Sequence, residues 1–422
     1  MKKKLLSVVM TLALGTGMLA GCGEAISSSD TASTTAATTA ATEAAAEDTT
    51  EAPAAATEST TEGATETAAV DDAISSAALK IAIVSSPSGV DDGSFNENNY
   101  NGILDFIAEA PNSTVTPVQE TTGDVTACIQ KVSDIVADYD VIVLCGYQFS
   151  AIGDIADANP DVDFILVDST PTYADGSTKD GAFDNVYSMT FKEQESGFPA
   201  GIAAALATKS NKVAVVNGLA YPSNVNYQYG FMSGVYYANA EYGTSAEIVE
   251  LPSYAGTDAN NNNVGGNYIG SFNDEATGKT VGDNLIKEGV DVIFVAAGNS
   301  GNGVFTAAKE ADGVYVIGCD VDQYDDGANG SSNIVLTSGL KIMDKNVKEQ
   351  LEKIAEGTFK GEDALLGADT DSTGYVSEEG RCQLTADEIS KIDEAFAKVK
   401  DGTVVPASFG GTTPDEFKAS LQ

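Results

Sequence analysis

The sequence predicts an α/β protein of two lobes, in which parallel sheets are flanked by helices. Three observations lead to this class. From residue 79 onward, short apolar runs alternate with helical patterns, which is typical of consecutive β-α-β units with parallel strands. About 350 residues carry this pattern, more than one ordinary core holds, so two lobes are expected. The apolar runs end in polar or glycine-rich turns, where open parallel sheets bind their ligands.

The first residues have the form of a secretory signal that ends in a lipoprotein cleavage site. Three lysines precede a short apolar stretch, which reaches Leu19-Ala20-Gly21-Cys22. The pattern predicts a signal peptide over residues 1–21 and a lipid on Cys22 of the processed chain. A transmembrane helix is the competing interpretation, and it is disfavoured because the stretch is short and interrupted by glycines.

Residues 22–75 are predicted to form a disordered tether behind the lipidated cysteine. From Glu24 to about Asp72 the chain is almost entirely Ala, Thr, Ser and Glu, without aromatic residues. Such a segment cannot bury enough apolar surface to offset the loss of chain entropy. A tether of this kind on a lipid anchor favours a location at the cell membrane, facing outside, on a Gram-positive surface.

The first strand is predicted at Leu79–Val84, and a helix should follow it. Ser94 and Glu97 have the S-x-x-E spacing of a capping box, which makes Ser94 the expected N-cap. The apolar residues of this helix define its expected buried face: Tyr100, Ile103, Leu104 and Ile107. Phe95 points about 150° away from the centre of that face. Its partner should therefore be either a neighbouring loop or a ligand.

The remaining elements continue the alternation. Strands are expected at Val141–Cys145, Val162–Val167, Val213–Val216, Val290–Ala296, Val314–Ile317 and Asn333–Leu336. Helices are expected at Phe149–Ala158, Val225–Ala240 and Ile342–Glu356. The folded part is assigned to residues 76–422. We expect lobe 1 to comprise about residues 78–188 plus a segment near 318–340, and lobe 2 to comprise about 189–317 plus most of the C-terminal part.

Five polar turns follow the predicted strands. They are Ser94-Phe95-Asn96, Gly146-Tyr147-Gln148, Asp168-Ser169-Thr170, Gly298-Asn299-Ser300-Gly301 and Asp320-Val321-Asp322-Gln323. Taken singly, each turn is explained at least as well by a structural role, as a helix cap or a turn former, as by ligand binding. Because the carboxyl ends of parallel strands meet at one edge of a sheet, the five turns together predict a ligand-binding cleft.

Composition and charge exclude several classes of function. The formal net charge is −41, so nucleic acid is not expected as a partner, because phosphate binding needs clustered Lys and Arg. The chain has no histidine, which removes the Ser-His-Asp triad, the usual general base and His-ligated metals. An acidic run from Asp369 imitates a calcium loop but carries Gly380 where a glutamate is required. We therefore expect no enzyme, no cofactor and no metal site.

The cysteines carry no metal or redox motif. Cys128, Cys145, Cys319 and Cys382 contain no C-x-x-C spacing. Cys145 and Cys319 fall at the ends of apolar runs, which is typical of small core residues. An extracellular disulfide remains open, and its pairing does not follow from the sequence.

The polar turns lie within longer segments that resemble the basic membrane protein family, the substrate-binding lipoproteins of nucleoside-type ABC importers. The segments that carry this resemblance are Asp91–Asn96, Asn159–Asp168, Phe191–Gly201, Pro222–Phe231, Ala297–Gly301, Ile317–Gln323 and Leu336–Lys341. The resemblance extends from about residue 79 to the end of the chain. It implies a two-lobed type I periplasmic-binding-protein fold, with a purine nucleoside in the interlobe cleft and ABC permease subunits as partners.

The resemblance also implies a role for each of seven residues. Phe95 would stack on one face of the base, Tyr227 would close on the other face from the second lobe, and Asn96 would hydrogen-bond the edge of the base. Asp168 matches the family acid that also contacts the base. Asp320 and Lys341 match the residues on the ribose hydroxyls, and Gly298 offers backbone where a side chain would intrude.

Three departures from the family pattern leave the nucleoside undetermined. Ser86 stands where many members have an aspartate, Tyr227 replaces a phenylalanine, and an asparagine-rich insertion occupies Asn260–Asn263. Other classes also remain open: a ligand-sensing lipoprotein that docks on a receptor, a sugar-binding protein of the same fold, or an enzyme on that fold. The absence of histidine disfavours the enzyme.

Overall fold

A computed structural model of the chain describes residues 70–422. The predicted signal peptide (1–21), Cys22 and most of the predicted tether lie outside the described residues. The end of the tether prediction is wrong, because residues 70–76 are helical and Ile74 is buried in the core of the first lobe. Within residues 70–422, no helix combines the length and the apolar character that crossing a membrane requires.

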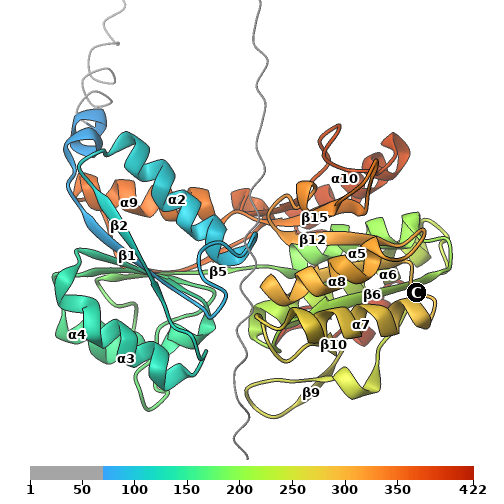
Figure 1. The fold of residues 1–422 in the computed structure, drawn as a ribbon, viewed down its shortest axis with the longest axis horizontal. Coiled ribbons are helices and arrows are strands. Elements are labelled where there is room, and N and C mark those ends of the chain that lie inside the picture. The colour runs from blue at the N-terminus through green and yellow to red at the C-terminus, as the bar shows by residue number, and fades with distance from the viewer. Residues whose placement is uncertain (1–69) are drawn as a thin grey trace, which may run out of the picture. The chain divides into compact units, whose positions relative to one another are not determined.

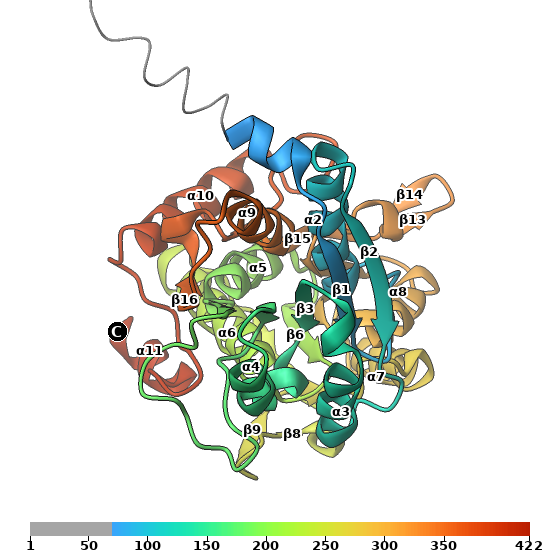
Figure 2. The same ribbon diagram turned by 90° about the vertical axis from the view of Figure 1, so that its left-hand side faces the viewer.

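The first lobe is built on a six-stranded parallel sheet (Figure 1). Its strands in spatial order are β16 (Glu362–Leu366), β5 (Val186–Phe191), β4 (Asp163–Val167), β3 (Val141–Cys145), β1 (Lys80–Ser85) and β2 (Thr114–Gln119). Side chains of β1 alternate between two apolar clusters, so both faces of the sheet are covered. Helices α2 (Phe95–Glu109) and α9 (Met343–Glu356) cover one face, and α3 (Val125–Ile135) and α4 (Gly153–Ala158) cover the other (Figure 2).

The second lobe contains the other large sheet. Its strands in spatial order are β10 (Asn267–Tyr268), β6 (Lys212–Asn217), β11 (Val292–Ala296), β12 (Tyr315–Asp320), β15 (Val335–Lys341) and the antiparallel β17 (Thr373–Tyr375), with β7 (Glu247–Ile248) paired to β6. The helices of one face are α5 (Gln194–Ala207), α6 (Pro222–Glu241), α10 (Ala386–Lys400) and α11 (Pro414–Ser420). The other face carries α7 (Glu275–Lys287) and α8 (Gly301–Lys309).

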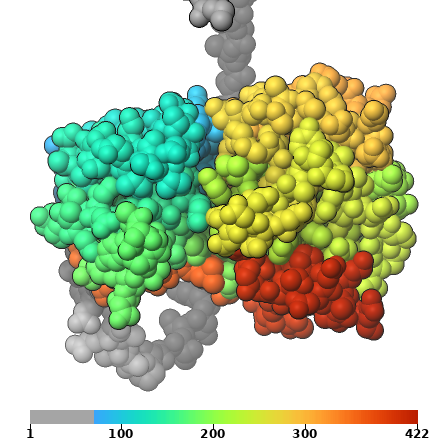
Figure 3. Space-filling view, turned by 90° about the horizontal axis from the view of Figure 1, so that it is seen from below, coloured from blue at the N-terminus to red at the C-terminus, as the bar shows by residue number. Residues whose placement is uncertain are grey.

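Short elements complete the described part of the chain. Two small hairpins pair β8 (Gly256–Thr257) with β9 (Asn263–Gly265) and β13 (Ala328–Asn329) with β14 (Ser332–Asn333). The 3₁₀ turns are Val136–Asp138, Tyr147–Ile152, Pro252–Tyr254, Gly298–Ser300, Asp325–Gly327 and Ala368–Thr370. On the face shown in Figure 3, the lobes meet along one boundary and the C-terminal segments lie on lobe 2. The asparagine-rich insertion, Asn260–Asn263, runs from the connection between β8 and β9 into the first residue of β9 and is exposed, so it belongs to a surface hairpin.

The chain crosses between the lobes three times: from β5 to α5, from β15 to α9, and from β16 to β17. The sequence-based division of the lobes is wrong in one respect. The segment near 318–340, assigned to lobe 1, supplies β12 and β15 of the lobe 2 sheet, and it is α9 and β16 that return to lobe 1. Buried parallel strands are all short apolar runs, so their local sequence does not specify which sheet they join.

The start of α2 confirms the predicted boundary but not the predicted cap. Ser94 occupies the N-cap position without a capping hydrogen bond from its side chain. Asp92 replaces it, accepting hydrogen bonds from the backbone N–H groups of Ser94, Asn96 and Glu97 at 3.1, 3.2 and 3.1 Å. A carboxylate that satisfies three unpaired N–H groups at a helix N-terminus fixes the loop from β1 to α2.

The buried face of α2 also differs from the expected one. Leu104 is 40% exposed, whereas Phe106 is fully buried. Asn99 and Gly102 are buried too, and a Cβ on Gly102 would lie 2.3 Å from the backbone oxygen of Asp344 in α9. Phe95 extends this face at its N-terminal end and packs against the lobe 1 core. Apolar residues alone did not predict the face, because Gly102 on this face lets the backbones of α2 and α9 approach closely.

Candidate functional site

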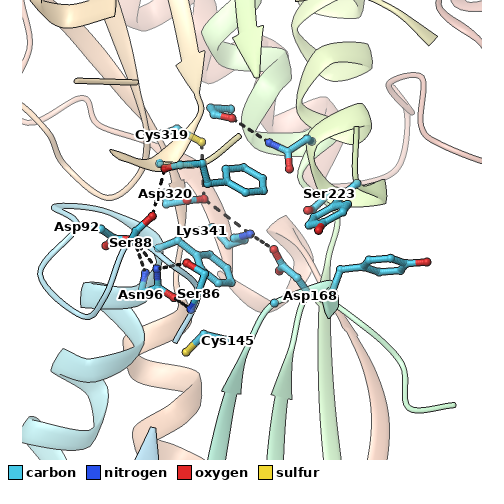
Figure 4. A pocket seen from close by; sticks show the side chains of 18 of the residues that line it. Ser86, Ser88, Asp92, Asn96, Cys145, Asp168, Ser223, Cys319, Asp320 and Lys341 are labelled. Atoms are coloured by element: carbon cyan, nitrogen blue, oxygen red, sulfur yellow. Dashed lines mark hydrogen bonds and ion pairs between the residues drawn. The ribbon is translucent and has the colours of Figure 1, made fainter. Parts of the chain in front are cut away.

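All seven residues predicted for the site line one pocket between the lobes (Figure 4). They are Phe95, Asn96, Asp168, Tyr227, Gly298, Asp320 and Lys341. The pocket encloses about 580 Å³, counting its opening to solvent. Lobe 1 supplies the loop from β1 to α2 and the turns after β3 and β4, while lobe 2 supplies the start of α6 and the ends of β11, β12 and β15. The strand-end turns therefore converge as expected from the parallel sheets.

Two acidic residues of the pocket have left-handed backbone conformations. Asp168 follows β4 with φ 61°, and Asp320 ends β12 with φ 68°. Non-glycine residues rarely adopt positive φ, although Asp and Asn tolerate it better than most. Strained residues of this kind cluster at functional sites, where the surrounding structure holds them in place. The two carboxyl groups are thus directed into the cleft by the backbone itself.

Lys341 joins the two lobes through its ammonium group, as Figure 4 shows. Its Nζ lies 2.7 Å from Asp168 Oδ2 of lobe 1 and 3.7 Å from Asp320 Oδ1 of lobe 2. The lysine side chain is only 2% exposed. Tyr227 donates a 2.7 Å hydrogen bond from its hydroxyl to Asp320 Oδ1. The hydroxyl that distinguishes Tyr227 from the expected phenylalanine therefore has a partner.

Burial and charge act in opposite directions on this group of residues. Burial alone would lower the pKa of Lys341, but Asp168, Asp320 and Glu193 together raise it above its ordinary value. Burial raises the pKa of Asp168, and the nearby Lys341 ammonium opposes that rise. Lys341 consequently stays protonated in the cleft, where it can donate hydrogen bonds.

One oxygen of Asp168 has no partner within residues 70–422. Its Oδ2 binds Lys341, whereas its Oδ1 is buried and has no donor at hydrogen-bond distance among the described residues; the nearby Ser223 hydroxyl only helps to lower the pKa of Asp168. A buried acceptor without a donor is unfavourable by about 1–3 kcal/mol. Because Asp168 lines the pocket, a ligand with a hydrogen-bond donor can satisfy this oxygen.

Aromatic rings surround the same ammonium group. Lys341 Nζ lies 4.9 Å from the ring centroid of Phe95, 5.6 Å from that of Phe191 and 5.7 Å from that of Tyr227. These distances are within the range of cation–π attraction. Phe95 is partly exposed and Tyr227 is almost fully buried. Of the two predicted stacking residues, Phe95 therefore has more ring surface available to a ligand.

The amide of Asn96 already has protein partners at both ends. Its Nδ2 donates to Asp92 Oδ2 at 2.6 Å and to Ser86 Oγ at 2.9 Å, and its Oδ1 accepts from the Ser86 backbone N–H at 3.4 Å. Burial raises the pKa of Asp92, and hydrogen bonds to the helix start oppose that rise. Asn96 would have to exchange one of these partners in order to contact a base directly.

Three further aromatic residues line the pocket, and none of them was among the seven residues predicted for the site. Tyr147 lies 5.0 Å from Tyr221, and Tyr221 lies 5.8 Å from Phe272, measured between ring centroids. Tyr147 belongs to one of the predicted polar turns, so that turn was a usable signal. Tyr221 and Phe272 lie in connecting segments of lobe 2 and carry no motif of their own. The three rings extend the aromatic lining across both lobes.

Hydrogen bonds close the lobes on each other beside the pocket. Ser94 Oγ donates to Asp320 Oδ2 at 3.3 Å, and Ser88 Oγ donates to the backbone oxygen of Phe272 at 3.1 Å. Ser94 therefore faces the other lobe, which explains why it does not cap α2. Both bonds end on residues that line the pocket, Asp320 and Phe272, so these contacts between the lobes lie at its edge.

The four cysteines of the described residues are all free thiols. Cys145 and Cys319 line the pocket and are buried, which raises the pKa of both thiols well above the ordinary value. Cys128 is buried and Cys382 is partly buried. Among residues 70–422, no three His, Cys, Asp or Glu side chains are grouped so that they could hold a metal ion.

Two α/β lobes, joined by three crossings and closed over a pocket at their strand ends, define the two-lobed periplasmic-binding-protein fold. A solute-binding protein of an ABC transporter system from Aeropyrum pernix shares this fold, with a TM-score of 0.64 and 23% identity over 81% of this chain and 96% of that one. The chain belongs to the Bmp family, described as ABC transporter substrate-binding protein PnrA-like, which matches residues 79–251 and 254–408. It is thus a transporter substrate-binding protein and not an enzyme.

Named relatives cover most of the folded part. The ABC transporter nucleoside-binding protein BmpA of Lactococcus lactis is 30% identical over 344 residues, which are 76% of this chain and 86% of the relative. The CD4+ T-cell-stimulating antigen of Listeria monocytogenes is 29% identical over 346 residues, which are 78% of this chain and 88% of the relative.

Proposed function

We propose that this substrate-binding protein binds a purine nucleoside in the pocket between its lobes. The observation that carries the proposal is the buried Asp168 Oδ1, which lacks a donor and lies in the same pocket as the partly exposed ring of Phe95. A purine nucleoside supplies an aromatic face for the ring and N–H or O–H donors for the carboxylate. The Lactococcus relative named as nucleoside-binding supports the same ligand class.

Each of the remaining site residues has a role in this proposal. Phe95 stacks on the base, and Tyr227 limits the cleft from lobe 2. Asp320 and Lys341 hydrogen-bond the ribose hydroxyls, beside the open backbone of Gly298. Asn96 holds the side chains of Asp92 and Ser86 by hydrogen bonds, and through these two pocket residues it influences how the base is bound. Among the pocket-lining residues the single basic side chain is already paired with two acids, which disfavours phosphorylated ligands.

Thermal stability of the purified protein tests the ligand class. Adenosine, guanosine or inosine should raise the melting temperature, because a ligand that binds only the native state stabilises it by RT ln(1 + [L]/Kd). Ribose and a panel of free sugars serve as the comparison. A clear shift with a sugar and none with any purine nucleoside would replace our proposal with sugar binding.

Replacing Phe95 with alanine should weaken binding of every purine nucleoside by about 5- to 150-fold, or about 1–3 kcal/mol, because the ring contacts a face that all bases share. Titration calorimetry measures the affinity. Leu104→Ala is the control, because Leu104 lies on the same helix, is exposed and does not line the pocket. If Phe95→Ala lowers ligand-free stability while affinity is unchanged, Phe95 is only a packing residue of lobe 1.

We also propose that a lipid on Cys22 holds the protein at the outer face of the cell membrane, where it delivers its ligand to ABC permease subunits. Cys22→Ser should release the protein from the membrane fraction into the medium, because a chain of charge −41 has no electrostatic attraction to anionic lipid. Uptake of labelled nucleoside by the cells should fall in parallel. Continued membrane association of the variant would refute the lipid anchor, and unchanged uptake would refute the delivery role.

A further inference from the structure

Glu193 is a buried acid of the interlobe region that was not among the seven residues predicted for the site. It lies on the crossing from β5 to α5, and Lys341 lies at the start of the crossing from β15 to α9. The side chain of Glu193 is 2% exposed, and it does not line the pocket. Its Oε2 accepts a 2.9 Å hydrogen bond from Asn226 Nδ2, and its Oε1 lies 3.8 Å from Lys341 Nζ. Glu193 therefore approaches the ammonium from behind the binding site.

The charged groups around Glu193 come from several elements. Lys341 faces it from the end of β15 and Asp168 from the end of β4, while Tyr227 of α6 is close to it as well. Asp320 reaches the same ammonium from β12. On the segment of Glu193 itself, two charged residues have other partners. Lys192 binds Asp369 at 3.0 Å, and Glu195 accepts from the Ala368 backbone N–H at 2.6 Å.

Three carboxyl groups thus share one ammonium in a buried region. If all were ionised, two negative charges would remain uncompensated where water cannot screen them, so one acid is expected to hold a proton. Burial raises the pKa of Glu193 to about 8, and the attraction of Lys341 only partly opposes this. The separation of 3.8 Å from Lys341 is longer than a direct hydrogen bond, which agrees with a neutral Glu193.

We propose that Glu193 is a positioning residue of the nucleoside site. In its neutral form it leaves the Lys341 ammonium between Asp168 and Asp320, and when it ionises it draws that ammonium away from the ligand. This role rests on the proposed function, since it concerns the affinity for the nucleoside. Glu193, which does not line the pocket, would thus set the position of the Lys341 ammonium, which does.

The proposal fixes the direction of a pH effect. Ionisation of Glu193 should weaken binding, so affinity should be constant below the folded-state pKa of about 8 and fall as the pH rises through it. One pH unit above that value, the neutral fraction has dropped about tenfold, which sets the expected loss of affinity. Glu193→Gln keeps the shape of the side chain and an acceptor for Asn226 but cannot ionise.

Titration calorimetry with adenosine between about pH 6 and pH 9 tests this role. Wild-type affinity should fall about tenfold over the upper part of the range, whereas Glu193→Gln should bind with the neutral-pH affinity throughout. Glu195→Gln is the matched control, because Glu195 is a buried acid of the same segment that does not contact Lys341, and its profile should follow the wild type. Parallel profiles for the wild type and Glu193→Gln would overturn the proposal.

A second measurement separates this proposal from the ligand assignment. Because the pKa of Glu193 is higher in the folded state than in the unfolded chain, wild-type stability without ligand should decline between about pH 4.5 and pH 8. Glu193→Gln should lack this part of the decline, so its melting temperature should rise relative to the wild type as the pH increases. Equal slopes would show that Glu193 does not hold the proton and would refute its role, even if adenosine proves not to be the ligand.

Discussion

Replacing Lys341 with methionine should destabilise the protein by about 3–5 kcal/mol at neutral pH and abolish nucleoside binding. Removal of one partner from a buried ion pair leaves the remaining charges without compensation, which is among the largest effects of a single substitution. Here Asp168, Asp320 and Glu193 would lose the one ammonium that all three approach within 4 Å. Urea unfolding and calorimetry measure the two losses.

The loss of stability in Lys341→Met should depend on pH. Burial already raises the pKa of Asp168 and of Glu193, the latter to about 8, and the loss of Lys341 removes the interaction that opposes these shifts. A protein that contains acids with raised folded-state pKa values becomes less stable as the pH increases. For Glu193 without Lys341, this loss runs from about pH 4.5 to beyond pH 8. The deficit should therefore be smallest near pH 5. An equal deficit at pH 5 and pH 8 would mean that the substitution acts through packing alone.

Two further variants test whether uncompensated buried charge causes the loss of stability in Lys341→Met. Adding Asp168→Asn to Lys341→Met should recover part of the stability, because it removes a buried charge and asparagine tolerates positive φ. Lys279→Met removes a partly exposed surface lysine that forms two ion pairs, of 3.0 and 2.9 Å, and should leave stability almost unchanged. If Lys279→Met proves as damaging as Lys341→Met, burial is not the reason for the effect.

The site was predicted from the sequence more fully than the division of the lobes was. Residues that end parallel strands are brought to one edge of each sheet by the topology, so the turns that contain Asp168 and Asp320 could be placed in the cleft from their strand positions. Lys341 was implied only by the family resemblance. The assignment of β12 and β15 to a sheet depends on pairing between distant segments, and apolar strand sequences do not specify those partners.

Residues that act across the lobes could not be predicted locally. Ser94 has the spacing of a cap, but its hydroxyl faces Asp320 of the other lobe, and Asp92 forms the cap instead. Glu193 belongs to a family motif in the sequence, yet its proximity to Lys341 exists only after both crossings are in place. Local spacing describes what a side chain can do, whereas its partner is selected by tertiary structure.

Replacing Gly234 with alanine should destabilise the protein by about 2–3 kcal/mol, because α5 and α6 pack with their backbones in close contact. A Cβ on Gly234 would lie 2.0 Å from the Phe198 backbone oxygen, and one on Gly201 would lie 2.1 Å from the Phe231 backbone oxygen. Alanine favours a helix over glycine by about 1 kcal/mol, so any net loss must come from forced separation of the helices. Urea unfolding measures it.

The same substitution should also weaken nucleoside binding, because α6 carries Tyr227, whose hydroxyl holds Asp320 in the cleft. A shift of α6 of a few tenths of an ångström lengthens that hydrogen bond and releases Asp320 from its position beside Lys341. Gly374→Ala is the control, because no atom lies within 4 Å of the added Cβ and its φ is not positive, so stability and affinity should both be retained. Unchanged stability in Gly234→Ala would show that α5 and α6 can move apart without a cost in free energy. The close packing of the two helices would then not be what fixes the position of Tyr227.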